Sequence, residues 1–202
     1  AQMTVAGGNT LSLGATQTFA ALNGTGTVTA STAAVMTIGN ILSPIISNSI
    51  FNGVLTGTNL SVIKAGQGTL TLGGAASNTN SGPAGTVVTG GTLVLAKTGG
   101  ATAISTSLTI DATGTAAGTA TVRLEGNDQI LTTATLTMNT GATLDLNGFN
   151  QSVGNLNGTD SGTIQNNASG TNVTLTLGTG DATGGVYLGR IADNASGTGT
   201  VA

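Results

Sequence analysis

The pattern most informative about the fold is Gly66-Gln67-Gly68-Thr69-Leu70-Thr71-Leu72-Gly73-Gly74. It recurs one short loop later as Thr89-Gly90-Gly91-Thr92-Leu93-Val94-Leu95. Each half is a glycine turn followed by Thr-Leu-x-Leu. The leucines fall on one face of this pattern and their β-branched partners on the other, a period of two that is typical of a half-buried strand. A helix would not separate the two residue types in this way.

The rest of the chain contains further short stretches with a similar alternation. They are Leu108–Ile110, Thr121–Leu124, Thr135–Met138, Thr143–Leu146, Val153–Leu156, Val173–Leu177 and Val186–Leu188. Most follow one another at intervals of about 8 to 23 residues, too short for the helical crossovers of a doubly wound sheet. Coils of a solenoid, with three short strands in each coil of about 20 to 25 residues, account for this spacing better.

An all-β solenoid of this size would have about nine coils and, at about 4.8 Å per coil, a length of roughly 40 Å. Threonines would form ladders on its outer faces. The leucines that we expect to point into the core are Leu70, Leu72, Leu93, Leu95, Leu144 and Leu146. A β-sandwich of hairpins is the alternative fold.

The repeated stretch also resembles a family of bacterial surface proteins. Its motifs are Gly68–Ala75, Gly91–Lys97, Ala103–Ser105, Leu108–Ile110, Gly141–Gly148 and Asn150–Leu156. In order and spacing they are similar to the autotransporter-associated β-strand repeat, also called the passenger-associated transport repeat, over roughly residues 50 to 180. The loop at Ser77–Pro83 departs from the family pattern because it lacks the usual aromatic residue. The resemblance implies a right-handed parallel β-helix in a secreted surface protein.

We expect the 202 residues to form a single β-solenoid domain with three parts. Residues 1–63 would supply N-terminal coils or a cap, residues 64–180 the repeat-like coils, and residues 181–202 the start of a further coil. The last assignment rests on Val186–Ile191, which looks like the lead-in to the first repeat at Phe51–Thr58.

Composition separates this chain from ordinary globular enzymes. Only 5% of the residues are charged and 2% aromatic, whereas about a quarter of the residues in a typical domain are charged. The 34 glycines favour turns, and a hydrophobic content of 38% argues against a disordered linker. Cysteine is absent, which excludes a disulfide framework and a thiolate metal site.

The net charge of −3 makes nucleic acid and anionic membrane poor partners, because Lys64, Lys97, Arg123 and Arg190 are scattered along the chain. No run of about eighteen apolar residues occurs, so the sequence predicts no membrane span. We interpret Lys64 and Lys97 as exposed charges that aid solubility or protect sheet edges.

Catalytic chemistry has few candidates here. There is no histidine, so the commonest general base and metal ligand is missing and Ser-His or Cys-His arrangements are impossible. The carboxylates that remain are Asp111, Glu125, Asp128, Asp145, Asp160, Asp181 and Asp193. The even spacing of three of them, Asp111, Asp128 and Asp145, would give an acidic column if coils stacked them, as in β-helix enzymes that act on acidic polysaccharides.

The structural interpretation of these carboxylates is stronger. Asp111 and Asp128 occur in turn-like surroundings, and Asp145 should point outward into water between Leu144 and Leu146. The calcium-binding glycine-rich pattern of some β-rolls occurs once only, at Gly178–Asp181. We therefore predict no catalytic, cofactor or metal site.

Three functions remain, in order of preference. The first is a non-enzymatic extracellular structural protein, either a stalk at the bacterial cell surface or a subunit of a head-to-tail filament. The second is an adhesin segment of an autotransporter passenger that binds host or matrix, and the third is a carbohydrate-active β-helix enzyme. An assembly interface would lie at the ends, where we expect pairing of Met3, Thr4 and Val5 with Gly197, Thr198, Gly199, Thr200 and Val201. The partner is a second copy or flanking repeats of a longer chain.

Overall fold

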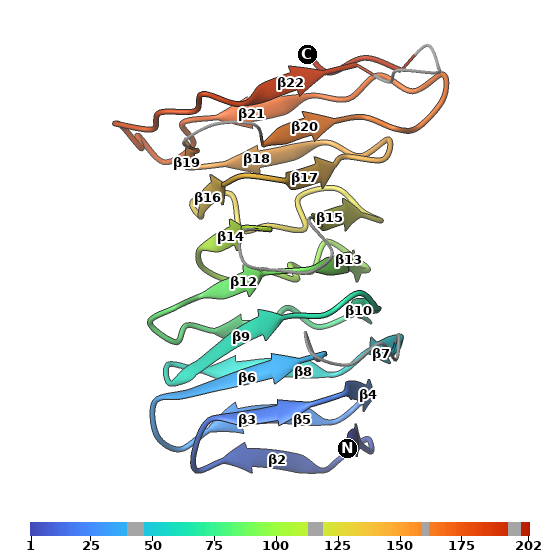
Figure 1. Ribbon diagram of the computed structural model, residues 1–202, viewed down its shortest axis with the longest axis vertical. Coiled ribbons are helices and arrows are strands. Elements are labelled where there is room, and N and C mark those ends of the chain that lie inside the picture. Colours follow the sequence, from blue (N-terminus) through green and yellow to red (C-terminus); the bar gives the residue numbers. More distant parts are fainter. Residues whose placement is uncertain (40–46, 113–118, 159–161, 194–198) are drawn as a thin grey trace.

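The computed structural model describes residues 1–39, 47–112, 119–158, 162–193 and 199–202, and this part of the chain is all β with no helix. Its strands stack as a β-solenoid of about 8 turns, from the N-terminus at one end to the C-terminus at the other (Figure 1). The predicted solenoid is thus confirmed. The strand pairs of the named sheets are all parallel, which excludes the hairpin sandwich.

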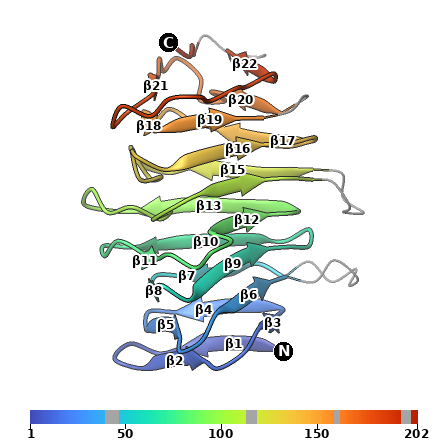
Figure 2. The same cartoon turned by 90° about the vertical axis from the view of Figure 1, so that its left-hand side faces the viewer.

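The strands lie on three sides of the solenoid, and most turns contribute a strand to each side (Figure 2). Sheet A is the longest, with the order β1 (Gln2–Val5), β4 (Ala21–Gly24), β7 (Ser49–Phe51), β10 (Thr69–Gly74), β13 (Gly91–Lys97), β15 (Ala120–Leu124), β17 (Ala142–Asp145), β20 (Thr163–Gln165) and β22 (Arg190–Ala192). Successive strands of this sheet lie one coil apart. The coils differ in length: Gln2 pairs with Ala21, whereas Leu93 pairs with Val122.

The other two sides are shorter. Sheet B contains β2 (Thr10–Leu13), β5 (Thr27–Ala30), β8 (Val54–Gly57) and β11 (Thr79–Asn80), and in later coils its place in chain order is taken by sheet D, the pair β18 (Gln151–Val153) and β21 (Leu175–Leu177). Sheet C contains β3 (Gln17–Phe19), β6 (Ala34–Ile38), β9 (Leu60–Lys64), β12 (Thr86–Val88), β14 (Leu108–Ile110), β16 (Thr135–Met138) and β19 (Asn155–Asn157). Residues 1–63 therefore form coils of the same sheets as the repeats.

The two halves of the repeat lie directly above one another. In the pairing of β10 with β13, Leu70 is opposite Leu93 and Leu72 is opposite Leu95. All four leucines are buried, as are Leu144 and Leu146 in a later coil, so the expected inward positions are confirmed. Stacked apolar side chains between coils remove the core from water, which is the main favourable term in folding.

Glycine is required at the corner that precedes each Thr-Leu-x-Leu strand. A Cβ on Gly68 would lie 2.1 Å from the carbonyl oxygen of Ser47, and a Cβ on Gly91 would lie 2.4 Å from that of Gly68. Gly91 also has a φ of 64°, a conformation that other residues adopt rarely. The corners of successive coils thus approach one another more closely than any side chain would allow.

Two glutamine side chains form hydrogen bonds to the backbone of the preceding coil at positions where no strand pairing continues. The side-chain oxygen of Gln129 accepts a hydrogen bond from the Lys97 N–H at 2.7 Å, and its Nε2 donates to the Lys97 carbonyl at 3.0 Å. Gln151 forms the same pair of bonds, here called a glutamine bracket, with Ile130. Its Oε1 accepts from the Ile130 N–H at 3.1 Å and its Nε2 donates to the Ile130 carbonyl at 2.9 Å. Both glutamines are buried, so they satisfy backbone groups that have no strand partner there.

Candidate functional site

The structure does not gather the evenly spaced carboxylates into a column. Asp111 directly follows β14 in sheet C, Asp128 lies in the turn after β15, and Asp145 ends β17 in sheet A. Asp160 lies outside the described residues. Within the described ranges, no three or more acidic residues come together in a way that would hold a metal ion.

Asp145 is buried, which corrects the expectation of an outward, solvated side chain. It is 7% exposed, and its Oδ1 accepts hydrogen bonds from the N–H groups of Asn147 at 3.0 Å and Asn167 at 3.1 Å. The alternation of the strand ends here because the chain turns over the carboxylate at Asn147, whose φ is 47°. Asp145 therefore ties its own turn to the turn of the next coil.

The other two carboxylates of the proposed column also bind neighbouring coils. Asp111 Oδ2 accepts a hydrogen bond from Asn139 Nδ2 at 3.0 Å, and Asp128 Oδ1 accepts one from the Ser152 N–H at 2.9 Å. Each bond joins residues more than twenty positions apart in the chain. These bonds fix the stacking of turns, a structural role that hydrogen bonds to charged groups serve well.

Lys64 is inside the solenoid, contrary to the exposed position that we inferred from the sequence. It is 1% exposed and lies between Ile38 and Val88 in the ladder of sheet C. Its Nζ donates to three carbonyl oxygens: those of Ala65 at 2.8 Å, Gly66 at 3.1 Å and Gly90 at 3.0 Å. The three donors of an ammonium group match these acceptors. Burial lowers the pKa of Lys64 to about 8.

Lys97 is also buried, at 3% exposed. It links two coils that are separated by one coil in the stack. Its Nζ donates to the carbonyl oxygen of Gly53 at 2.7 Å, 44 positions back in the chain. Burial lowers the pKa of Lys97 to about 8. Sequence reasoning missed both lysines. A lysine at the end of an amphipathic strand, just before a glycine corner rich in carbonyl groups, was the only local signal for Lys64.

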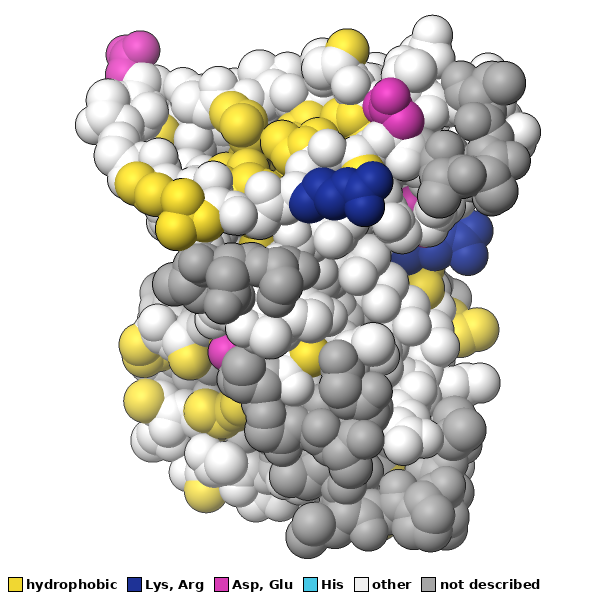
Figure 3. Space-filling view, turned by 45° about the horizontal axis from the view of Figure 1, so that its top comes forward, with side chains coloured by type: hydrophobic (Ala, Val, Ile, Leu, Met, Phe, Trp, Pro, Cys, Tyr) yellow, Lys and Arg dark blue, Asp and Glu magenta, His cyan; other side chains and the backbone are white. Residues whose placement is uncertain are grey.

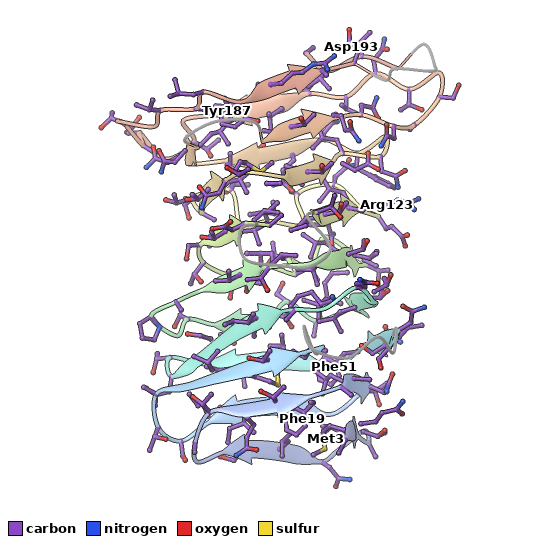
Figure 4. All side chains as sticks on the ribbon, in the orientation of Figure 1. Met3, Phe19, Phe51, Arg123, Tyr187 and Asp193 are labelled. Carbon is purple, nitrogen blue, oxygen red and sulfur yellow. The ribbon has the colours of Figure 1, made fainter. Side chains whose placement is uncertain are left out.

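The N-terminal end exposes the open edge of the first coil. The strands β1, β2 and β3 are the terminal strands of sheets A, B and C, with no described strand beyond them. Met3 and Leu11 pack against the core but are only partly buried, unlike Leu22, which is opposite Met3 in the second coil and fully buried. Figure 4 shows Met3 at this end and Asp193 at the opposite end.

The C-terminal end exposes more apolar surface. The described part of the chain has six exposed large hydrophobic side chains, and four of them lie in its last turns: Leu177 at 47%, Val186 at 62%, Leu188 at 68% and Ile191 at 47%. Hydrophobic side chains gather on this end of the molecule in Figure 3.

The predicted interface residues occupy different sides of the solenoid. Met3, Thr4 and Val5 belong to β1 in sheet A, whereas Val201 forms a parallel bridge with Val173, beside sheet D. Gly197 and Thr198 lie outside the described residues, and Gly199 and Thr200 directly precede the bridge. The strand that occupies the sheet A position at the C-terminal end is β22. Continuation of sheet A would therefore bring β1 to β22, and not to Gly199–Val201.

No protein-family model, no curated protein and no solved structure matches this chain. The class that the fold defines is the parallel β-solenoid. Among the described residues, no helix is long and apolar enough to cross a membrane.

Proposed function

We propose that this chain is a non-enzymatic structural protein of the bacterial cell surface, a β-solenoid segment that acts as a rigid rod. The observation that carries the proposal is sheet A, whose nine parallel strands run from one end of the described chain to the other. A continuous ladder of this kind resists bending, because bending would stretch the hydrogen bonds that join each coil to the next.

The use of the polar side chains supports a structural role. Buried polar side chains bind backbone groups of their own or other coils, as in Asp145, Gln129, Gln151 and both lysines. Groups committed in this way are poor nucleophiles and poor general bases, because a bound substrate would have to compete with the backbone for them. The resemblance to autotransporter passenger repeats supports the extracellular location.

A turnover assay tests the absence of catalysis. The purified chain is incubated with a panel of acidic and neutral polysaccharides beside an Asp111→Asn, Asp128→Asn double variant, and both are expected to give the same background rate. Saturable hydrolysis or elimination that is lost in the variant would overturn the non-enzymatic assignment. Location is tested by protease treatment of intact cells that express the native protein: exposure of the chain is expected, and complete protection would contradict it.

A further inference from the structure

The backbone edges at the two ends of sheet A are complementary. Residues of a parallel strand bond alternately to the neighbour on one side and the neighbour on the other. In β1 the Val5 carbonyl accepts from the Thr25 N–H, so the odd-numbered residues bond towards β4. The N–H and C=O groups of Gln2 and Thr4 consequently face the outer edge.

The same alternation holds at the other end. In β22 the Arg190 N–H donates to the Gly162 carbonyl at 2.8 Å, so Arg190 bonds towards β20. The N–H and C=O groups of Ile191, the next residue, face outward. In a parallel pair, the N–H of such a residue donates to a C=O of the neighbouring strand, and its C=O accepts from an N–H two positions further along that strand. Gln2 and Thr4 of β1 offer that pair.

The inward side chains of β1 and β22 are consistent with this pairing. Met3 lies opposite the fully buried Leu22, and Ile191 lies opposite the fully buried Ile164, so both point towards the core. Each is more exposed than its partner because no described coil covers it. If Met3 and Ile191 were opposite one another, the apolar column of sheet A would continue across the joint.

We propose that a second copy of this chain docks head to tail, with β1 of one copy pairing in parallel with β22 of the other and Met3 opposite Ile191. The Ile191 N–H donates to the Gln2 carbonyl, and the Thr4 N–H donates to the Ile191 carbonyl. A second copy is the favoured occupant because its first coil has the strand direction, the inward positions and the free edge groups that β22 requires. The inference rests on the proposed function and names the partner of the rod.

This docking differs from the pairing expected from the sequence. The Val201 N–H already donates to Asp193 Oδ1 at 2.8 Å, so that donor is not free to bind another strand. In this proposal β22 makes the joint, and Ile191, which is 47% exposed, would be covered by it. A contact between opposite ends leaves one free end on each copy, so assembly continues into a filament.

Disulfide cross-linking tests the register, because the chain contains no cysteine. Residues opposite one another in neighbouring strands have Cα atoms about 4.8 Å apart, within the range of about 4.4–6.8 Å that a disulfide spans. A Met3→Cys, Ile191→Cys variant treated with a mild thiol oxidant is expected to form a ladder of covalent multimers. The matched control is Met3→Cys, Ile50→Cys, because Ile50 is 56% exposed but lies on β7, away from the ends. Equal cross-linking of the two variants would overturn the register.

A mixing experiment tests the polarity of the contact. Ile191→Lys blocks one end and Met3→Lys blocks the other, and far-UV circular dichroism first establishes that each variant is folded. In sedimentation, the unmodified chain and the Ile50→Lys control are expected to gain mass with concentration, whereas each end variant alone loses this association. Mixed together, the two end variants are expected to form a 1:1 dimer and nothing larger.

Three outcomes would overturn the docking: an unmodified chain that stays monomeric at every concentration, loss of association in the Ile50→Lys control, or a mixture that stays monomeric. A monomer would also favour the occupation of this face by flanking repeats of a longer chain. None of these outcomes contradicts the structural role, which the turnover and protease experiments test separately.

Discussion

Each inward residue of sheet A packs against the coils on both sides. Leu93 lies between Leu70 and Val122 in the ladder and is 1% exposed. Leu93→Ala is expected to lower the free energy of unfolding by about 2–4 kcal/mol, because it leaves a cavity between coils. Thr71→Ala, on the outer face, is expected to cost less than about 1 kcal/mol. Denaturant titrations measure both, and equal losses would contradict the inward and outward assignment.

Ser49 occupies an inward position that neighbouring coils fill with leucine. It lies opposite Leu70 and is 4% exposed, and its hydroxyl has no hydrogen-bond partner among the described residues. Burial of an unpaired hydroxyl is unfavourable, so Ser49→Ala is expected to raise the free energy of unfolding by about 1 kcal/mol. The exposed Ser12 serves as the control, with no change expected in Ser12→Ala. A destabilised Ser49→Ala variant would show that the hydroxyl stabilises the fold.

The buried Lys64 makes stability depend on pH. Its pKa is about 8 in the folded chain and 10.5 in the unfolded chain, so between these values the unfolded state binds more protons. Stability is then expected to rise with pH across this window, by up to about 1.4 kcal/mol per pH unit. The cost of burying the ammonium group is fully present below pH 8 and disappears above pH 10.5.

Denaturant titrations from pH 7 to about pH 9.5 measure this slope. The upper limit avoids the ionisation of Tyr187, whose pKa burial raises above the usual 10.0. Lys97 contributes to the slope in the same direction, because burial lowers its pKa as well. In Lys64→Met the slope is expected to be smaller. An unchanged slope in that variant would show that Lys64 does not cause it.

The glutamine brackets form hydrogen bonds to backbone groups that a neighbouring strand would otherwise bind. Gln129 satisfies both backbone groups of Lys97, which ends β13 beyond the last residue of that strand paired with β15. Gln129→Leu preserves much of the side-chain volume but leaves those groups buried and unpaired, at an expected cost of about 1–3 kcal/mol. Gln67→Leu, at an exposed corner, is the control and is expected to be nearly neutral. Thermal melts compare the two, and similar melting temperatures would contradict the bracket.

At the scale of the whole molecule, the solenoid is a one-dimensional stack in which each coil contacts its neighbours. The end coils have one neighbour and the middle coils have two, so stability is expected to fall towards both ends. Hydrogen exchange should be slowest in β10 and β13 and fastest in β1 and β22. The experiment is best performed on Ile191→Lys, because end-to-end contacts in the unmodified chain would protect β1 and β22. Uniform exchange along the chain would indicate a single cooperative unit.

The strands and corners of each coil follow from local patterns in the amino-acid sequence. The alternation in Thr69–Leu72 and Gly91–Leu95 places the leucines on one face of each strand. This placement does not depend on the rest of the chain, because the period of two is a property of the strand backbone. Glycine before each strand marks the corner for an equally local reason, the space that a Cβ would need. From these features the parallel solenoid, its inward leucines and its three strands in most coils could be predicted.

The directions of the long polar side chains depend on contacts between coils that are distant in the sequence. Lys64, Lys97 and Asp145 are the last residues of their strands, where the sequence predicted an outward position, yet all three are buried. Their partners are backbone groups of turns and neighbouring coils, several of them more than twenty residues away in the chain, so no local pattern reveals them. In the proposed contact between copies, the summed lengths of all the coils place β22, and not the last residues of the chain, in line with β1.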